Sequence, residues 1–114
     1  MQENTGPLTV LALHVLIALA TEPRHGYAVI RDIEDRTGGE LRVRSGTLYV
    51  ALQRLAHEGL IEEAPAEAGA DPRRRYYRLT DSGRAAAEAE VSRLGRLVGD
   101  ARRRFGFAGT GGRR

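Results

Sequence analysis

The sequence predicts one mainly α-helical domain with a small β-hairpin, followed by a long C-terminal helix. Three observations lead to this fold class. Apolar residues recur at helical spacing in four segments. Two short segments that read as strands, residues 60–64 and 74–79, flank a loop that contains Gly69 and Asp71-Pro72, which favour turns. The chain has 114 residues, which leaves little room for a second core.

The first two helices are predicted over Pro7–Thr21 and roughly His25–Arg36. Proline fits the first turn of a helix because its missing N–H is not needed there, and Glu22-Pro23 breaks the segment. The first helix is apolar on nearly every side, so more than one of its faces must be covered, and a second subunit is the natural source of that cover. Gly38-Gly39 ends the second helix.

A third helix is predicted to begin at Ser45, whose hydroxyl can cap it, and to end at Gly59. Its inward face carries Leu48, Ala51, Leu52 and Leu55. Leu60–Ala64 and Arg74–Leu79 then read as antiparallel strands around the loop Pro65–Arg73. Two helices, a turn, a third helix and a hairpin make a winged helix-turn-helix over residues 7–80.

The last helix is predicted from Thr80 or Asp81 to Phe105. Its apolar residues follow an a/d heptad pattern, with Leu97 widening the stripe: Ala87, Val91, Leu94, Val98, Ala101 and Phe105. Such a helix is about 37 Å long, longer than the winged core is wide, so we expect residues 81–105 to form a dimerisation helix. Residues 1–6 are expected to be a flexible N-terminus and residues 106–114 a disordered basic tail.

Charge is distributed unevenly along the chain. Residues 1–40 carry three Arg against six acids, residues 41–84 eight against six, and residues 85–114 seven against three. All 18 basic residues are Arg, a bias that codon usage in a GC-rich genome explains, but each is a planar fork suited to phosphate or guanine. A capped helix that can enter a groove, beside a basic hairpin, is what a small DNA-reading domain needs.

Several motifs resemble the PadR family of bacterial transcription regulators. They are HGYAVI (residues 25–30), GTLYVALQRLAHEGLI (46–61) and RRYYRLTDSG (74–83), in the family's order and spacing. The resemblance implies a cytoplasmic homodimer that binds a near-palindromic operator and usually represses a neighbouring gene. It also implies that the C-terminal helix packs against the partner's N-terminal helix. Val50 stands where the family commonly has Pro, and the last helix lacks the Trp residues between which some small members stack planar drugs.

These observations define two candidate sites. The predicted DNA contacts lie on the third helix, ahead of it, on the hairpin and at the start of the second helix: Arg42, Arg44, Ser45, Gly46, Thr47, Tyr49, Val50, Gln53, Arg54, Arg73, Arg74, Arg75, Tyr76, His25 and Tyr27. The predicted dimer interface is Leu11, Val15, Ala87, Val91, Leu94, Leu97, Val98, Ala101 and Phe105. His25 is interpreted as structural, a helix cap or a phosphate neighbour.

Three functional readings stay open. The first is a DNA-binding repressor, and the second is a sensor that binds a small apolar effector between the subunits, around Leu11, Val15, Leu94 and Val98. The third, a winged helix used only for protein contacts, is disfavoured because the third-helix region is net basic. We expect no cofactor or metal, because the chain has no Cys and no His-x-x-x-His pair, and no enzyme, because no triad spacing or phosphate-binding glycine pattern occurs. The apolar segment Leu8–Ala20 is too short to span a bilayer, so we expect no membrane contact.

Overall fold

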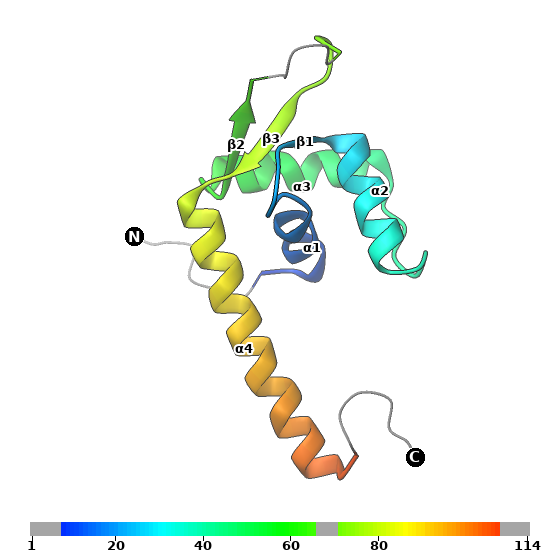
Figure 1. Cartoon of the computed structure of the whole chain (residues 1–114), viewed down its shortest axis with the longest axis vertical. Helices are drawn as coiled ribbons and strands as arrows, with labels where there is room; N and C mark the ends of the chain where they lie inside the picture. Colours follow the sequence, from blue (N-terminus) through cyan, green and yellow to red (C-terminus); the bar gives the residue numbers. More distant parts are fainter. Residues whose placement is uncertain (1–7, 66–70, 108–114) are drawn as a thin grey trace.

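The described residues, 8–65 and 71–107 of the computed structural model, form four α-helices and one three-stranded sheet (Figure 1). In chain order the elements are α1 (Val10–Ala18), β1 (Arg24–His25), α2 (Gly26–Arg36), α3 (Ser45–His57), β2 (Ile61–Ala64), β3 (Tyr76–Leu79) and α4 (Asp81–Phe105). The predicted fold class, a winged helix-turn-helix with a long C-terminal helix, is confirmed. The predicted N-terminal segment 1–6, Pro7, Gly69 and the tail beyond Phe107 lie outside the described residues.

Helix α1 is shorter than the predicted Pro7–Thr21. Thr9 caps its N-terminus, since the Thr9 hydroxyl accepts the Ala12 N–H at 3.0 Å. At the other end, the Leu19 N–H bonds both the Val15 and the Leu16 carbonyl oxygens at 3.2 Å, so the last turn tightens and the helix ends. A side-chain cap and a tightened last turn therefore set the two ends.

The turns after α2 and α3 contain the predicted glycines, but α3 does not start as predicted. Gly38 and Gly39 have φ of 61° and 84°, and Gly59 has φ of 79°, so each occupies the left-handed region that favours glycine. The predicted Ser45 cap is wrong: Ser45 is the first residue of α3, and Arg44 occupies the cap position without a side-chain cap bond. A helix can begin without a side-chain cap where tertiary packing holds it.

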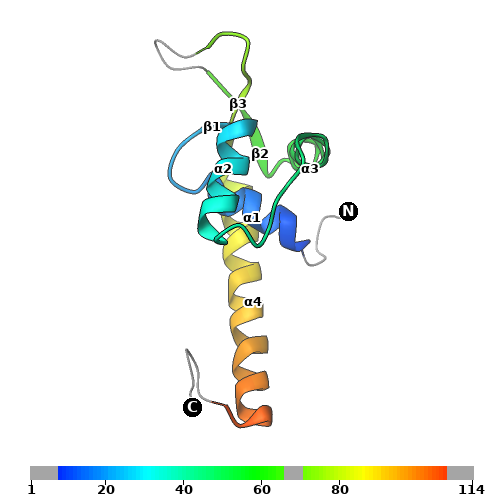
Figure 2. The ribbon, with the colours of Figure 1, turned by 90° about the vertical axis from the view of Figure 1, so that its right-hand side faces the viewer.

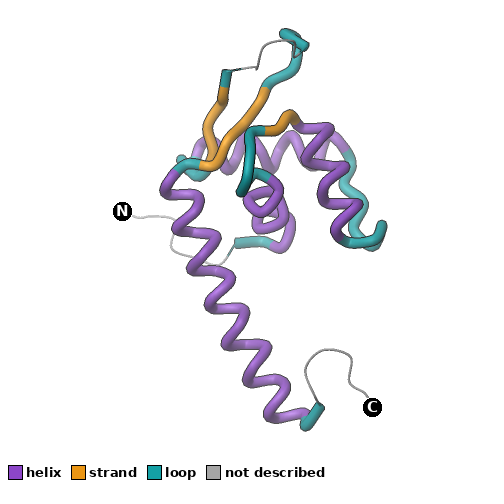
Figure 3. Tube along the Cα trace, in the orientation of Figure 1, coloured by secondary structure: helices purple, strands orange, loops and turns teal. Residues whose placement is uncertain are grey.

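The sheet has the order β1-β3-β2, and both pairings are antiparallel (Figure 3). In the hairpin, Ile61 lies opposite Leu79 and Ala64 opposite Tyr76, so each strand is shorter than predicted by one or two residues. Strand β1 was not predicted. It is only two residues long and pairs with the far edge of β3, where Arg24 lies opposite Tyr77.

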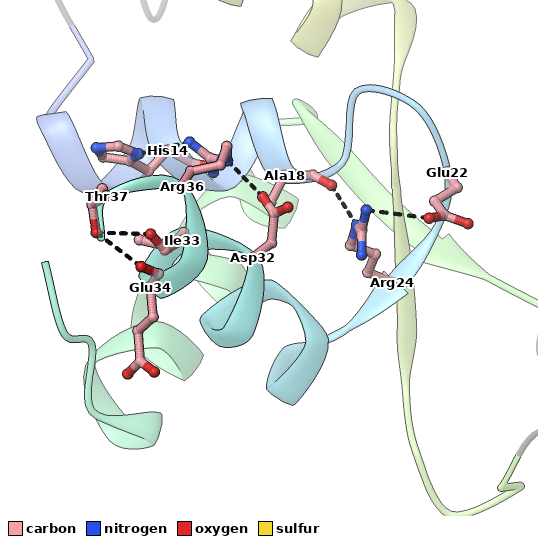
Figure 4. A network of polar contacts seen from close by, with 9 residues as sticks. All are labelled: His14, Ala18, Glu22, Arg24, Asp32, Ile33, Glu34, Arg36 and Thr37. Atoms are coloured by element: carbon pink, nitrogen blue, oxygen red, sulfur yellow. Dashed lines mark hydrogen bonds and ion pairs between the residues drawn. The ribbon is translucent and has the colours of Figure 1, made fainter. Parts of the chain in front are cut away.

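The hydrophobic core lies between α1, α2, α3 and the sheet. Its fully buried side chains come from all four: Leu16 and Val15, Val29 and Ile33, Leu48 and Leu52, and Ile61. Three arginines also hold α1 by donating to backbone carbonyls within it or just after its end. Arg24 bonds the Ala18 oxygen at 2.8 Å and Arg36, which is paired with Asp32, bonds the His14 oxygen at 3.0 Å (Figure 4). From α4, Arg84 bonds the Ala20 oxygen at 2.9 Å.

Helix α4 starts beside the hairpin, passes α1 and then runs away from the core (Figures 1 and 2). Thr80 caps it: the Thr80 hydroxyl accepts the Gly83 N–H at 3.0 Å and donates to the Gly59 carbonyl oxygen at 2.7 Å. At Gly83 the helix backbone approaches the hairpin so closely that a Cβ would lie 1.9 Å from the Leu60 carbonyl oxygen. Gly83 therefore sets how near α4 lies to the base of the hairpin.

Candidate nucleic-acid interface

Helix α3 presents one buried and one exposed face, as the sequence predicts. Leu48, Leu52 and Leu55 are buried. The opposite face is exposed and carries six of the predicted DNA contacts: Gly46, Thr47, Tyr49, Val50, Gln53 and Arg54. Val50 is 66% exposed although it is apolar, and α3 continues regularly through it. A helix whose exposed face carries small and polar side chains can fit into the major groove of DNA.

Arg42 and Arg44 lie on either side of a buried anchor. Val43 between them belongs to the core, and both arginines are exposed. Arg44 directly precedes α3 and has an extended backbone, with φ of −73° and ψ of 147°. The Arg42 guanidinium instead lies near Gly39, where a Cβ would be 3.8 Å from its Nη2, so of the two predicted residues only Arg44 is placed directly at the start of α3.

The arginine run before β3 is exposed and weakly paired. The Asp71 carboxylate accepts the Arg73 backbone N–H at 2.9 Å and its side chain at 3.2 Å, and Arg75 lies 3.3 Å from Glu63. The Arg73 side chain lowers the pKa of Asp71, chiefly through its hydrogen bond. Such exposed ion pairs contribute only about 0–1 kcal/mol, so these arginines can exchange a carboxylate for another anion at little cost.

His25 joins the hairpin to α2. Its Nδ1 accepts the Ala28 N–H at 3.2 Å, so His25 is the N-cap of α2, and the structural interpretation is confirmed. The edge of Tyr76 packs on its ring, with 5.3 Å between centroids. Burial and the nearby Arg74 guanidinium lower the pKa of His25, while Asp71 opposes them.

These groups surround a hollow of about 490 Å³ between α2, α3 and the hairpin, here called the wing hollow. Its lining includes six of the predicted DNA contacts: His25, Tyr27, Tyr49, Arg73, Arg74 and Arg75. Thr47, Val50 and Arg54 instead line a second hollow of about 400 Å³ beside the start of α1. The predicted residues therefore divide between the two sides of α3, and Arg54 pairs with Glu58 at 3.5 Å.

One cation near this surface was not predicted. Arg31 on α2 lies one helical turn after Tyr27, and its guanidinium is 5.7 Å from the centre of the Tyr27 ring. Its i,i+4 spacing from an exposed tyrosine was the only sequence signal. Beside it, a hollow of about 420 Å³ shares His25, Tyr27 and Arg74 with the wing hollow and is here called the α2 hollow.

The apolar stripe of α4 is largely exposed within the single chain. Val91, Leu97, Val98 and Phe105 are between 44% and 77% exposed, and Leu94 and Ala101 are half-buried. Three predicted interface residues differ: Val15 is 0% exposed in the chain's own core, and Leu11 and Ala87 pack against that core. Helical periodicity could not distinguish them, because α1 is apolar all round and the start of α4 lies on α1.

Two kinds of feature, a metal-binding cluster and a membrane-spanning helix, are absent from the described residues. Within residues 8–65 and 71–107, no three His, Asp or Glu side chains gather in a way that could hold a metal ion. None of the helices in the described ranges is long and apolar enough to cross a membrane.

Comparison with known proteins places the chain in context. Residues 15–89 match the Transcriptional regulator PadR-like family. An uncharacterized protein X of Lysinibacillus sphaericus is 31% identical over 71 residues, which are 62% of this chain and 65% of that protein. An uncharacterized 37.1 kDa protein in transposon TN4556 of Streptomyces fradiae is 41% identical over 85 residues, 75% of this chain but 23% of that protein. The chain thus spans less than two thirds of either curated relative.

Solved structures share the fold along most of the chain. A transcriptional regulator from Clostridium thermocellum has a TM-score of 0.70 at 25% identity, over 83% of this chain and 88% of that one. A PadR family transcriptional regulator from Eggerthella lenta has a TM-score of 0.65 at 30% identity, over 83% and 80%. Bacillus subtilis PadR in complex with operator DNA has a TM-score of 0.64 at 24% identity, over 73% of this chain and 47% of that one. This structure has the same fold.

Proposed function

Because this chain belongs to the PadR-like family of transcriptional regulators, we propose that it binds a specific double-stranded DNA operator as a homodimer and represses transcription. The exposed face of α3, with the arginines of residues 73–75 across the wing hollow from it, is the observation that carries the proposal. Gln53 would read adenine, Thr47 and Val50 would contact thymine methyl groups, and the arginines would hold phosphates.

The proposed dimer sets the spacing of the two recognition helices. Residues 7–80 would form the DNA-binding unit and residues 81–105 the dimerisation helix. The exposed Val91, Leu97, Val98 and Phe105 support this division, because an apolar stripe of that extent on a small chain marks an interaction surface. Two α3 helices held about 34–36 Å apart would enter successive major grooves of a near-palindromic site. We assign no catalytic residue, and a bacterial cytoplasm is the expected setting.

Binding to the DNA upstream of the chain's own gene, followed by fluorescence anisotropy in rising salt, tests this proposal. If each subunit neutralises three or four phosphates, the log–log salt slope is roughly −5 to −7. A slope near zero, or no binding to that DNA in low salt, would contradict DNA binding. An operator that carries one half-site should bind one dimer far more weakly than the full site.

A second candidate function is sensing of a compact apolar effector. It is supported by a hollow of about 370 Å³ between α1, β3 and α4, lined mainly by aliphatic side chains: Leu16, Ile17, Ala20, Leu79, Ala87 and Val91. This hollow differs from the predicted effector residues, because Val15 is buried in the core and Leu94 and Val98 lie further along α4. A bound ligand would shift DNA affinity only by its preference for one spacing of the two α3 helices. Thermal-shift screening of small apolar compounds, followed by the DNA assay, tests this candidate.

A further inference from the structure

The side chains between α2 and the hairpin make a cation-rich cluster around one exposed ring. Tyr27 is 56% exposed, and two guanidinium groups face its ring, Arg31 at 5.7 Å and Arg74 at 6.0 Å from the centroid. Arg31 also donates to the Tyr27 hydroxyl at 3.4 Å. His25 stacks near Tyr27 at 6.5 Å, with 8° between the ring planes. One cation comes from a helix and the other from the hairpin, and both lie near the Tyr27 ring and line the α2 hollow.

This cluster holds more hydrogen-bond donors than acceptors. Arg74 Nη1 lies 2.7 Å from His25 Nε2 and 3.2 Å from Nδ1, while Nδ1 also faces the Ala28 N–H. A neutral imidazole has one lone pair to offer, and arginine has none. In the tautomer whose Nδ1 accepts the Ala28 N–H, the ring proton is on Nε2 and faces the Arg74 donor. An oxygen acceptor between His25 and Arg74 would satisfy both.

The charges around His25 favour an anion where the wing hollow and the α2 hollow meet, at His25, Tyr27 and Arg74, which line both. The wing hollow is lined by Arg73, Arg74 and Arg75 and by no carboxylate. In the α2 hollow the acids Asp32 and Asp35 accompany Arg24, Arg31 and Arg74. Asp32 is already paired with Arg36 at 2.7 Å, and Asp71 with Arg73 at 3.2 Å and, more loosely, with Arg74 at 3.9 Å. The Tyr27 hydroxyl contact raises the pKa of Arg31, which keeps its charge at every relevant pH.

We propose that His25, Tyr27, Arg31 and Arg74 together form a binding site for one phosphate group. Arg74 would leave the imidazole for the phosphate, Arg31 would approach from α2, and the His25 Nε2–H and the Tyr27 hydroxyl would donate to its remaining oxygens. This proposal rests on the proposed function, because a backbone phosphate of the operator, held between α3 and the hairpin, is the first source of the group. A free phosphorylated molecule offers the same chemistry.

Operator binding by three variants tests the site in DNA. We expect Arg31→Gln and Arg74→Gln each to weaken binding about five- to tenfold at constant salt and to reduce the salt slope by about 2 per dimer, one phosphate per subunit. The double variant should bind hardly more weakly than either single one, because both arginines hold the same phosphate. Arg96→Gln, at an exposed arginine in the second half of α4, is the control and should change neither quantity.

The free protein tests the second source. Inorganic phosphate is added to the ¹⁵N-labelled chain and compared with sodium chloride at equal ionic strength. We expect amide shifts centred on Gly26 and Ala28 that disappear in Arg31→Gln. Phosphate shifts with unchanged DNA affinity would assign the site to a free phosphate, and changed DNA affinity without phosphate shifts would assign it to the DNA backbone.

Two results separate this proposal from the proposed function. If the wild-type chain binds its operator, Arg31→Gln behaves like Arg96→Gln and phosphate causes no local shift, the phosphate site is refuted while DNA binding stands. If the wild-type chain binds no DNA but phosphate produces the expected shifts, the site stands and the regulator function fails.

Discussion

Replacing Gly83 by alanine should lower the free energy of unfolding of the chain, although alanine is the better helix former. A Cβ at this position would lie 1.9 Å from the Leu60 carbonyl oxygen, 2.9 Å from the Leu60 carbonyl carbon and 3.0 Å from Leu79 Cδ1. Ordinary van der Waals contact begins at about 3.4 Å, so α4 or the base of the hairpin must move by roughly 1.5 Å. The atoms in the way are mainly backbone, and no side-chain rotation relieves them.

The expected net loss is about 2–3 kcal/mol in the free energy of unfolding. Forcing one extra methyl group into a packed site costs typically about 1–3 kcal/mol, and a backbone clash lies at or above the top of that range. The gain of about 1 kcal/mol in helix propensity offsets only part of it. The same displacement disturbs the Thr80 N–H bond to the Leu60 oxygen, which is 3.2 Å long.

Urea unfolding at one fixed protein concentration measures this change, and Gly95→Ala is the matched control. Gly95 lies in the same helix, and a Cβ there would meet nothing within 4 Å. We therefore expect Gly95→Ala to raise the free energy of unfolding by up to about 1 kcal/mol. Equal stabilisation in both variants would show that α4 does not approach the Leu60 carbonyl, and the reasoning would be wrong.

Three further predictions concern recognition, assembly and pH. Gln53→Ala should reduce discrimination at one base pair by about 1–3 kcal/mol, whereas Arg73→Gln should weaken all sequences alike; competition binding against single-base operator variants distinguishes the two outcomes. Val98→Glu should weaken the proposed dimer by at least about tenfold, since it would bury a charge in the interface, and an unchanged sedimentation profile would count against α4 as the dimerisation helix. Burial, reinforced by Arg36 and Arg74 respectively, lowers the pKa of His14 and of His25 below 6.5, so the unfolded chain binds more protons there. Stability should accordingly fall as the pH drops from about 7.5 to about 5.5, and this slope should flatten in a His14→Gln/His25→Asn variant, in which the asparagine side chain can still cap α2.

The sequence predicted those features that depend on local chemistry or on strong periodicity. The glycine at position 59 predicts the end of α3, and the apolar spacing predicts a last helix that starts near Thr80 or Asp81; the structure confirms both. The predicted cap at Ser45 is wrong, and the hydroxyl group on which that prediction rested is also the source of the error. A hydroxyl residue before an apolar run can be the cap or the first helical residue, and only the packing of Val43 decides which.

The features that were missed depend on contacts distant in sequence. Strand β1 has two residues and no alternation to recognise, and it exists because β3 offers a free edge. Val15 and Ile17 look alike in a helix that is apolar all round, yet the first is fully buried and the second is 40% exposed. Arg31 is a candidate phosphate-binding residue because Arg74, from the distant hairpin, lies over the same tyrosine ring, and the sequence does not show that proximity.

The three arginine bonds at α1 give this helix an unequal tolerance to mutation. In each of them the acceptor is a main-chain oxygen, of His14, Ala18 or Ala20, which every amino acid supplies. Changes at those three positions keep these main-chain acceptors, although a His14 replacement loses the ring contact to Arg36 and Ala18 is buried in the core, while loss of Arg36, Arg24 or Arg84 removes one bond outright. Over evolutionary time the surface of α1 can therefore vary to suit a new partner. The arginines on α2, β1 and α4 should be kept for as long as the fold is kept.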